Sequence, residues 1–531
     1  MTSVPQRPDP PSVPPAAVAE PFLPAAPPRR IRTISAALVA AGVTALLLLP
    51  GLGALGLQGD EGIYGLVVGD LLTTGRTSRL TLEGAAYLSK PPLAFWLMGI
   101  SAHASELDER ALRLPGVLAS LALSLVVFAV ARRRSGPAFA VLAVALFLSA
   151  PHALYFHGWR SAVTEPWLAL WTVLALVANG RVHRPGVKHS ILAALGTLSA
   201  LTKGLLGPAL VALTLVFADT LVHRGSGESR PKLRRFVPAV AILAPAVLAY
   251  LGWWLWNFPS LHQLARFLRR DWLLRAAGTF EAVHVQDAGY FAAQLVREFG
   301  AWLILLVPAY WPRSWRKLRA DRDLEGTSYR LFPALALGVL SLPASKIAWY
   351  LYPAYPVLAL VMAEGARDLW DRIARRRLLA GVMVVAIGAM LTLRVRDAFL
   401  YLPSSPRASL HGLAVFVDRV PEARVLVDER LRSAPHRPRE WNRFTIRHRL
   451  RAEPWIAGAP VPESDCRFLL TPAPNGPPVT NLIEPSRVVL VAKQARSRPE
   501  PDLFIVDLCG GRFSDSVARR PAIRSDLHSA D

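Results

Sequence analysis

Residues 34–56 read ISAALVAAGVTALLLLPGLGALG, and this stretch decides the fold class of the chain. The run has no charged residue and is long enough to cross the roughly 30 Å hydrocarbon layer of a bilayer as a helix. Arg29, Arg30 and Arg32 precede it, as is typical of a cytoplasmic flank. Residues 1–31 repeat proline and lack an apolar period, which predicts a disordered cytoplasmic tail.

The composition of the whole chain also indicates a membrane protein. Of its 531 residues, 52% are hydrophobic and only 19% are charged, less charge than the surface of a soluble protein of this length needs. A formal charge of +23 would fit a nucleic-acid-binding protein, but most arginine clusters lie in short loops between apolar runs. We therefore interpret the charge as a signal of topology and predict no nucleic-acid partner.

About eleven transmembrane helices are predicted when the later apolar runs are added to the first. Those runs are approximately 113–131, 137–157, 164–180, 190–203, 205–222, 236–257, 289–311, 329–345, 347–367 and 378–395. The basic clusters between them alternate to one side, which the positive-inside rule assigns to the cytoplasm. An odd number of spans then places residues 398–531 outside the cytoplasm.

The C-terminal segment differs from the membrane part. Apolar runs at 425–427, 468–470, 488–491 and 503–506 alternate with Pro-rich and Arg-rich connections, which predicts a small α/β domain. We thus expect a mainly α protein with three parts: a tail (1–31), a membrane domain (32–397) and an extracytoplasmic domain (398–531). Cys466 and Cys509 both lie in the last part, where a disulfide and two buried thiols are equally open alternatives.

Polar residues follow the first span directly. Asp60 and Glu61 stand at its exit, followed by Tyr64 and then by Ser89 and Lys90. Adjacent carboxylates near a membrane surface can supply a general base, a metal ligand or a hydrogen-bond acceptor for a polar substrate. The alternative is a solvated helix cap.

Several motifs recur in a fixed order along the chain. They are Asp60-Glu61, then Lys90-Pro91-Pro92-Leu93 with Trp96, then Arg110-Ala111-Leu112-Arg113-Leu114-Pro115, Leu201-Thr202-Lys203-Gly204, and Ser345-Lys346 to Trp349-Tyr350-Leu351-Tyr352-Pro353 with Tyr355-Pro356. In these motifs residues 34–370 resemble the bacterial membrane glycosyltransferases of the GT-C class that include the aminoarabinose transferase of lipid A and the protein O-mannosyltransferases. The C-terminal domain matches that family only in its placement.

The resemblance implies a reaction and a set of partners. The donor would be a polyprenyl-phosphate-linked sugar whose lipid lies beside the helices of the cell membrane. An acceptor would attack the anomeric carbon while the lipid phosphate leaves. A membrane-lipid headgroup, an envelope glycan or Ser/Thr of an exported protein are the alternatives for that acceptor.

The resemblance also implies site residues. Asp60 matches an essential aspartate that acts as catalytic base or orients the acceptor, and Glu165 matches a second acidic position that is more often Asp. Lys90 matches a lysine that contacts the lipid phosphate. Lys203 stands so close to hydrocarbon that it needs a partner, whether the donor phosphate, a carboxylate or water. Each also has a purely structural alternative. Lys90 could snorkel from a helix end, Lys203 could be a snorkelling turn residue, and Glu165 could complement the dipole at a helix N-terminus.

Further positions complete the expected site. Asp271, Arg275 and His284 match a later outer loop, although its usual proline and second tyrosine are replaced by Asp287 and Phe291. The remaining candidates are Lys346, Tyr350 and Tyr352 for the donor phosphate, and Glu61, Tyr64 and Arg160 for substrate. An amphipathic interfacial helix and an aromatic belt would also explain these outer-loop and tyrosine positions.

One departure concerns metal binding. In the aminoarabinose-transferase branch a glutamate commonly precedes the lysine and has been linked to a metal site, whereas this chain has Ser89. A divalent cation thus stays an open alternative, and no metal ligand is predicted. The rival functions are a transporter or flippase of lipid-linked sugars and an inactive, binding-only relative.

Overall fold

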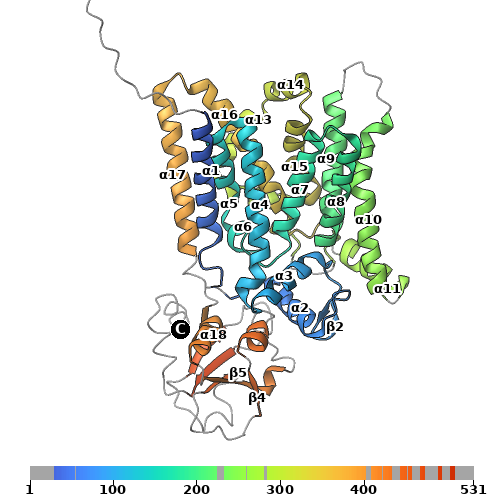
Figure 1. Ribbon diagram of the computed structural model, residues 1–531, viewed down its shortest axis with the longest axis vertical. Helices are drawn as coiled ribbons and strands as arrows, with labels where there is room; N and C mark the ends of the chain where they lie inside the picture. The colour runs from blue at the N-terminus through green and yellow to red at the C-terminus, as the bar shows by residue number, and fades with distance from the viewer. Residues whose placement is uncertain are drawn as a thin grey trace, which may run out of the picture.

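The computed structural model describes residues 29–53, 56–223, 232–258, 260–274, 276–279, 284–401, 408–420, 423–432, 443–450, 452–456, 467–472, 488–492 and 503–508. The molecule is mainly helical, with a sheet close to the C-terminus (Figure 1). Cys466 and Cys509 lie outside the described residues, and so does Arg275.

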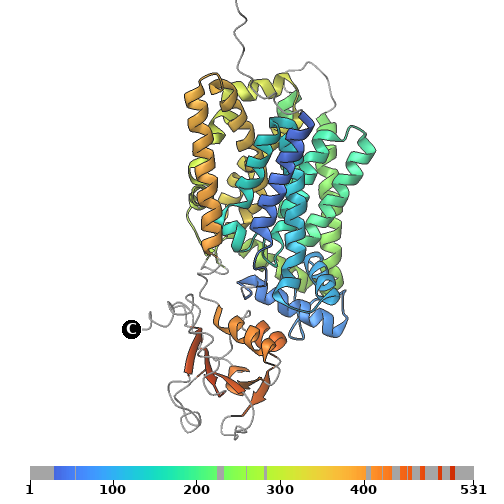
Figure 2. The ribbon, with the colours of Figure 1, turned by 60° about the vertical axis from the view of Figure 1, so that its left-hand side comes forward.

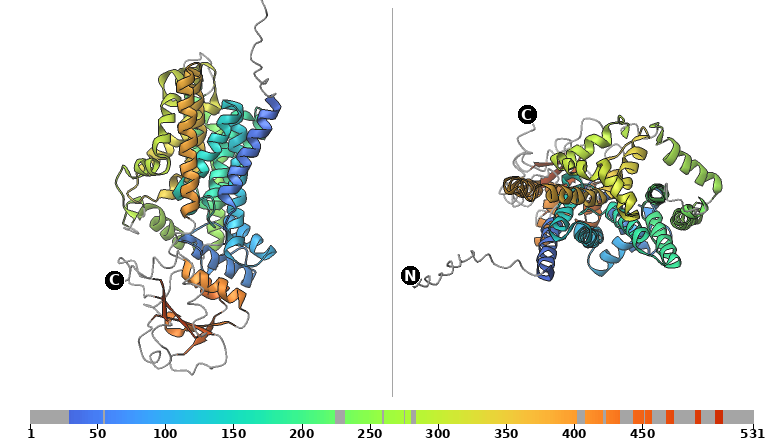
Figure 3. Two further views of the ribbon diagram at one scale, coloured as in Figure 1. Left: turned by 90° about the vertical axis from the view of Figure 1, so that its left-hand side faces the viewer. Right: turned by 90° about the horizontal axis from the view of Figure 1, so that it is seen from above.

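Long helices form the bundle that dominates the molecule. They are α1 (Arg29–Leu48), α4 (Glu109–Ser135), α5 (Pro137–Leu148), α7 (Glu165–Arg181), α8 (Pro185–Lys203), α9 (Leu206–His223), α10 (Val237–Asn257), α15 (Leu324–Ser341), α16 (Tyr355–Ile373) and α17 (Arg377–Tyr401). Each overlaps one of the apolar runs expected to span the membrane. The helix α17 stands at the edge of the bundle (Figure 3).

Among the residues that the structure describes, four helical stretches are long and apolar enough to cross a membrane: Glu109–Ser135, Leu206–His223, Leu233–Asn257 and Tyr290–Tyr310. Four shorter apolar helices accompany them: Thr33–Leu48, Leu93–Ala104, Pro137–Leu148 and Arg377–Leu393. The helical class is therefore confirmed, while the number of about eleven spans stays a prediction.

Three of the expected spans are broken into shorter pieces. The run 137–157 continues after α5 as the short α6 (Pro151–Tyr155), because Pro151 cannot donate a backbone hydrogen bond within a continuous helix. The run 289–311 consists of α12 (Tyr290–Phe299), η4 (Gly300–Leu305) and α13 (Leu306–Tyr310), and Gly300 interrupts it at φ +54°. A 3₁₀ turn, η5 (Ala348–Ala354), opens the run before α16.

Shorter elements lie between the long helices. These are η1 (Lys232–Phe236), α11 (Leu261–Leu268), η2 (Arg269–Leu274) and α14 (Pro312–Ala320).

The polar stretch after the first span, to which no secondary structure was assigned from the sequence, folds into a compact unit. It contains α2 (Asp60–Thr74), β1 (Thr81–Leu82), β2 (Ala85–Ala86) and α3 (Leu93–Ala104). Glu83 and Gly84 both have positive φ between the two strands, as a tight hairpin turn requires. The Asp70 carboxylate accepts a hydrogen bond from the Gly84 N–H at 3.0 Å and so ties this turn to α2.

The C-terminal part contains a five-stranded sheet in the order β4-β3-β5-β7-β6. Its strands are β3 (Arg424–Asp428), β4 (Glu453–Trp455), β5 (Arg467–Thr471), β6 (Val488–Ala492) and β7 (Leu503–Asp507). β3 pairs in parallel with β4 and β5, whereas β7 pairs antiparallel with β5 and β6. One face packs on α18 (Ala408–Arg419) through Leu413 and Phe468, and the predicted apolar runs lie within the strands.

The C-terminal part inserts an aromatic side chain into the unit built on α2. Phe444, just before η7 (Thr445–Arg449), is fully buried among Tyr64, Leu66 and Phe95. A Cβ on Gly65 would lie only 2.6 Å from the Phe444 ring, and one on Gly69 would lie 2.4 Å from the His448 ring. These two glycines, Gly65 and Gly69, therefore form a socket that admits the rings of Phe444 and His448.

Ion pairs surround this socket. Arg443 pairs with Glu83, Arg447 lies 3.1 Å from the Asp70 carboxylate, and Arg449 lies 3.4 Å from that of Glu109. The sheet and α18 consequently lie at the same end of the bundle as α2 and α3 (Figure 2).

We predict that Phe444→Ala loosens α2 without unfolding the bundle. The deletion leaves a cavity, and a buried Phe→Ala change costs about 3–5 kcal/mol, so the amides of α2 should exchange hydrogen faster. Hydrogen-exchange mass spectrometry of the intact protein measures this. In the control Phe416→Ala the lost ring packs on Phe468 within the C-terminal core. Equal exchange of α2 in both variants would contradict the socket.

Candidate functional site

Glu61 is a buried carboxylate with both oxygens hydrogen-bonded. Its oxygens accept hydrogen bonds from Arg113 at 2.8 and 2.9 Å. The backbone N–H groups of Ala162 and Gln58 donate to it at 2.7 and 2.8 Å. Burial alone would raise the pKa of the Glu61 carboxyl, but Arg113 and these N–H groups outweigh burial and leave the pKa below its usual value.

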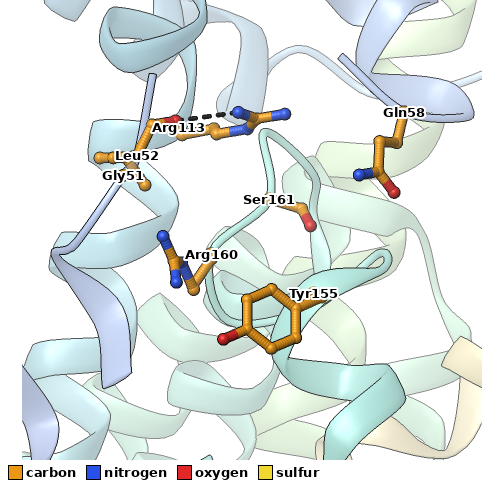
Figure 4. A pocket seen from close by; sticks show the side chains of 7 residues that line it. All are labelled: Gly51, Leu52, Gln58, Arg113, Tyr155, Arg160 and Ser161. Atoms are coloured by element: carbon orange, nitrogen blue, oxygen red, sulfur yellow. Dashed lines mark hydrogen bonds between the residues drawn. The ribbon is translucent and has the colours of Figure 1, made fainter. Parts of the chain in front are cut away.

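Arg113 extends this bonding to the segment between α1 and α2. Its guanidinium donates to the carbonyls of Leu52 and Gly56, both at 2.9 Å. Figure 4 shows Arg113 beside Leu52 at a small pocket that Gln58 and Arg160 also line. The geometry therefore gives Glu61 a structural role, although the sequence analysis grouped it with the substrate-binding residues.

Asp60 is the first residue of α2 and is only partly buried. Gly59 precedes it at φ +53°, a conformation that favours glycine, and a Cβ there would lie 2.9 Å from Nε2 of His157. Asp60 is thus held at a helix N-terminus by its bonded neighbour Glu61, where the macrodipole favours a carboxylate.

Glu165 and Lys203 form an ion pair between two helices. Glu165 opens α7 and Lys203 closes α8, and the ammonium group contacts the buried carboxylate directly. Gly204, at φ +98°, ends α8 and lets the chain turn directly into α9. The Lys203 ammonium also lies 4.9 Å from the centre of the Tyr350 ring, so a cation, a carboxylate and an aromatic face meet here.

Tyr64 lies close enough to both Asp60 and Glu165 for their charges to act on it. Burial raises the pKa of its hydroxyl well above the usual value, and the charges of Asp60 and Glu165 raise it further. The hydroxyl consequently stays protonated and can donate a hydrogen bond. Lys90 is half-buried and close enough for its charge to act on Glu165.

His157 and Trp349 belong to the same group, and the sequence analysis missed both as site residues. Their rings stack with centroids 3.9 Å apart and planes 6° from parallel. His157 has φ +55°, an uncommon conformation for a residue other than glycine. The charges of Asp60, Glu165 and Lys203 all act on its ring. The unusual backbone and the stack depend on tertiary contacts, so no local pattern could have indicated them.

Three candidates lie in other surroundings. Arg160 donates to the carbonyls of Leu47 and Pro50 at the end of α1 and lies over the Tyr155 ring. The Tyr352 hydroxyl is bonded to His152 Nδ1 at 2.6 Å. The Lys346 ammonium donates to the carbonyls of Gln286 and Pro343. These contacts hold the backbone around the site.

The later outer loop is described only in part. His284 accepts a hydrogen bond at its carbonyl from the Lys346 N–H at 2.8 Å, and Val285 forms a bridge with Ser345. Asp271 lies in η2, but its side chain is outside the described residues. Within the part of the chain that the structure describes, no three His, Cys, Asp or Glu side chains are placed to hold a metal ion.

Solved structures share this fold. The crystal structure of ArnT from Cupriavidus metallidurans bound to undecaprenyl phosphate matches 90% of this chain and 98% of its own, with a TM-score of 0.56 at 17% identity. The archaeal oligosaccharyltransferase AglB from Archaeoglobus fulgidus, in complex with an inhibitory peptide and a dolichol-phosphate, matches 80% of this chain and 64% of its own, with a TM-score of 0.51 at 14% identity. The fold therefore resembles that of GT-C class membrane glycosyltransferases.

Sequence comparison points to particular relatives. An undecaprenyl phosphate-alpha-4-amino-4-deoxy-L-arabinose arabinosyl transferase of Pseudomonas savastanoi pv. phaseolicola is 28% identical over 62% of this chain and 60% of that relative. Its counterpart in Edwardsiella ictaluri is 24% identical over 62% of this chain and 59% of its own length. This chain thus spans less than two thirds of these curated relatives. The profile of the family "Dolichyl-phosphate-mannose-protein mannosyltransferase" matches residues 89–256, which include Lys90, Glu165 and Lys203.

We predict that Glu61→Gln lowers stability far more than the neighbouring Asp60→Asn. Removing one charge of a buried pair costs about 3–5 kcal/mol, because Arg113 would remain buried without its counter-charge. Thermal unfolding in detergent compares the two variants. An equal loss in both, or no loss in Glu61→Gln, would contradict the structural assignment.

Proposed function

We propose that this chain is an integral membrane glycosyltransferase that transfers a sugar from a polyprenyl-phosphate-linked donor to an acceptor outside the cytoplasm. The observation that carries the proposal is the meeting of Asp60 and Glu165 with Lys90 and Lys203 at one end of a helical bundle. The names of the sequence relatives support a lipid-phosphate sugar donor. These relatives are named as transferases, so they give no support to the alternative function of a transporter.

The reaction follows from the charges of this group. A bond forms between the acceptor oxygen and the anomeric carbon, while the bond from that carbon to the lipid-phosphate oxygen breaks. Lys90 and Lys203 would stabilise the negative charge that develops on the leaving phosphate. Asp60 would take the proton of a hydroxyl acceptor, or orient an acceptor that is already an anion.

Glu165 and the aromatic residues have supporting roles in this proposal. The Glu165 carboxylate orients the Lys203 ammonium and makes its burial tolerable before the donor phosphate binds. Tyr350 holds the same ammonium over its ring, and Tyr64 offers a hydroxyl donor. The stacked pair His157 and Trp349 would limit the space available to the sugar.

We further propose the membrane arrangement. About eleven helices cross the bacterial inner membrane, with the N-terminus in the cytoplasm and both the Asp60 site and the C-terminal α/β domain outside it. The broken runs α5–α6 and α12–η4–α13 would each count as one crossing. The arginine clusters at 132–134, 313–319 and 372–377 then all face the cytoplasm.

We predict that Asp60→Asn lowers kcat for sugar transfer by about 10²- to 10⁴-fold, the usual contribution of a general base. A labelled polyprenyl-phosphate sugar and mass spectrometry of envelope glycolipids, glycans and exported proteins measure transfer and identify the acceptor. The matched control Asp287→Asn changes an exposed outer carboxylate. Full activity of Asp60→Asn would overturn the catalytic assignment.

We predict that Lys90→Ala raises the KM for the donor by about 10- to 100-fold, because a hydrogen bond to a charged group contributes about 1.5–3 kcal/mol. The KM for the acceptor should change much less. Lys90→Arg should recover part of the loss, since it retains the charge, and Lys317→Ala at the far end of the bundle should behave as wild type. Unchanged donor kinetics would exclude a phosphate role for Lys90.

A further inference from the structure

A cavity of about 1030 Å³ opens at the end of the bundle opposite to Asp60. It lies between the last turn of α7, the first turns of α8 and α10, the last turns of α9, η1 and the residues that precede α15. Glu165 and Lys203 stand at the other ends of α7 and α8, so this cavity is separate from the proposed transfer site.

The cavity is strongly basic. Four Lys and Arg side chains line it, joined by three histidines, and among the described lining residues Asp219 is the only carboxylate. Asp219 lies 3.4 Å from His223, at the rim formed by α9. The four cations are Lys188, Arg234, Arg235 and Arg322.

Other arginines at this end of the bundle lie outside the cavity and pair with carboxylates. Arg133 and Arg181 lie 2.7 and 2.8 Å from the Glu325 carboxylate. Arg134 pairs with Asp323 at 2.7 Å, and Arg330 pairs with Glu364 at 2.8 Å. Carboxylates within the bundle thus neutralise these central arginines, and the described residues that line the cavity include four cations and one carboxylate.

An apolar surface continues from the cavity along α10. Val237 lines the cavity and is 41% exposed, and Val240 and Leu248 farther along α10 are 58% and 73% exposed. Val237, Val240 and Leu248 are spaced by three and eight positions, so they form one stripe on a single face of α10. The basic cavity and the stripe together match a ligand with an anionic head and apolar tails.

We propose that this cavity binds the phosphate headgroup of an anionic phospholipid, with the acyl chains along the stripe of α10. Arg and Lys side chains bind phosphate oxygens through charge-assisted hydrogen bonds. Basic pockets between membrane helices suit such headgroups, and their cations attract anionic lipid more than zwitterionic lipid. The proposal does not depend on sugar transfer.

The test uses the full chain purified in detergent and mixed with phosphatidylglycerol or phosphatidylethanolamine. Native mass spectrometry measures retained lipid, and we expect wild type to retain phosphatidylglycerol preferentially. The double variant Arg234→Gln/Arg235→Gln should bind phosphatidylglycerol about tenfold more weakly or worse. The control Arg375→Gln/Arg376→Gln removes the same charge from an exposed turn between α16 and α17 and should bind as wild type.

A second arm distinguishes a lipid headgroup from free phosphate. Phosphatidylglycerol should raise the unfolding temperature of wild type and of the control, but not of the Arg234/Arg235 variant, and millimolar inorganic phosphate should have no such effect. Stabilisation by inorganic phosphate alone would overturn the lipid assignment. Equal retention of phosphatidylglycerol by the two double variants would overturn the site.

Discussion

The buried ion pair between Glu61 and Arg113 is the constraint on which the proposed site depends. It joins the segment after α1, the start of α2, helix α4 and the turn before α7 through one carboxylate and one guanidinium. Consecutive residues of a helix point about 100° apart, so fixing Glu61 inward also fixes the direction of Asp60. One acidic residue holds the backbone, and its neighbour remains available for chemistry.

Glu165, the second acidic residue of the proposed site, is also held by an ion pair. Glu165 and Lys203 were both expected in the site, but their direct pairing joins residues on two helices and could not be derived from the sequence. Arg160 shows the opposite outcome. It stands close to Glu165 in the chain, yet the turn between α6 and α7 directs its side chain to the carbonyls of Leu47 and Pro50. Spacing along an irregular segment does not determine direction, whereas spacing along a helix does.

Much of the helical fold could be predicted because a long apolar run has few alternatives to a membrane helix. The interruptions at Pro151 and Gly300 have local causes, since proline lacks the backbone donor and glycine tolerates a positive φ. The fold of residues 60–104 was missed for another reason. Its apolar core is completed by Phe444, a residue from a distant part of the chain. Gly65 and Gly69 are needed only because the rings of Phe444 and His448 occupy the space that a Cβ would fill.

This late contribution affects the order in which the protein can mature. During synthesis the segment with Asp60 leaves the ribosome early, and the C-terminal segment leaves it near the end. Until Phe444 arrives, α2 has an open socket and Glu83, Asp70 and Glu109 lack their arginine partners from that segment. The unit built on α2 therefore reaches its final packing only when nearly the whole chain has been made. A truncated product would have the membrane helices, the polar residues of the site and the Glu61–Arg113 pair, but its α2 would lack the packing that Phe444 completes.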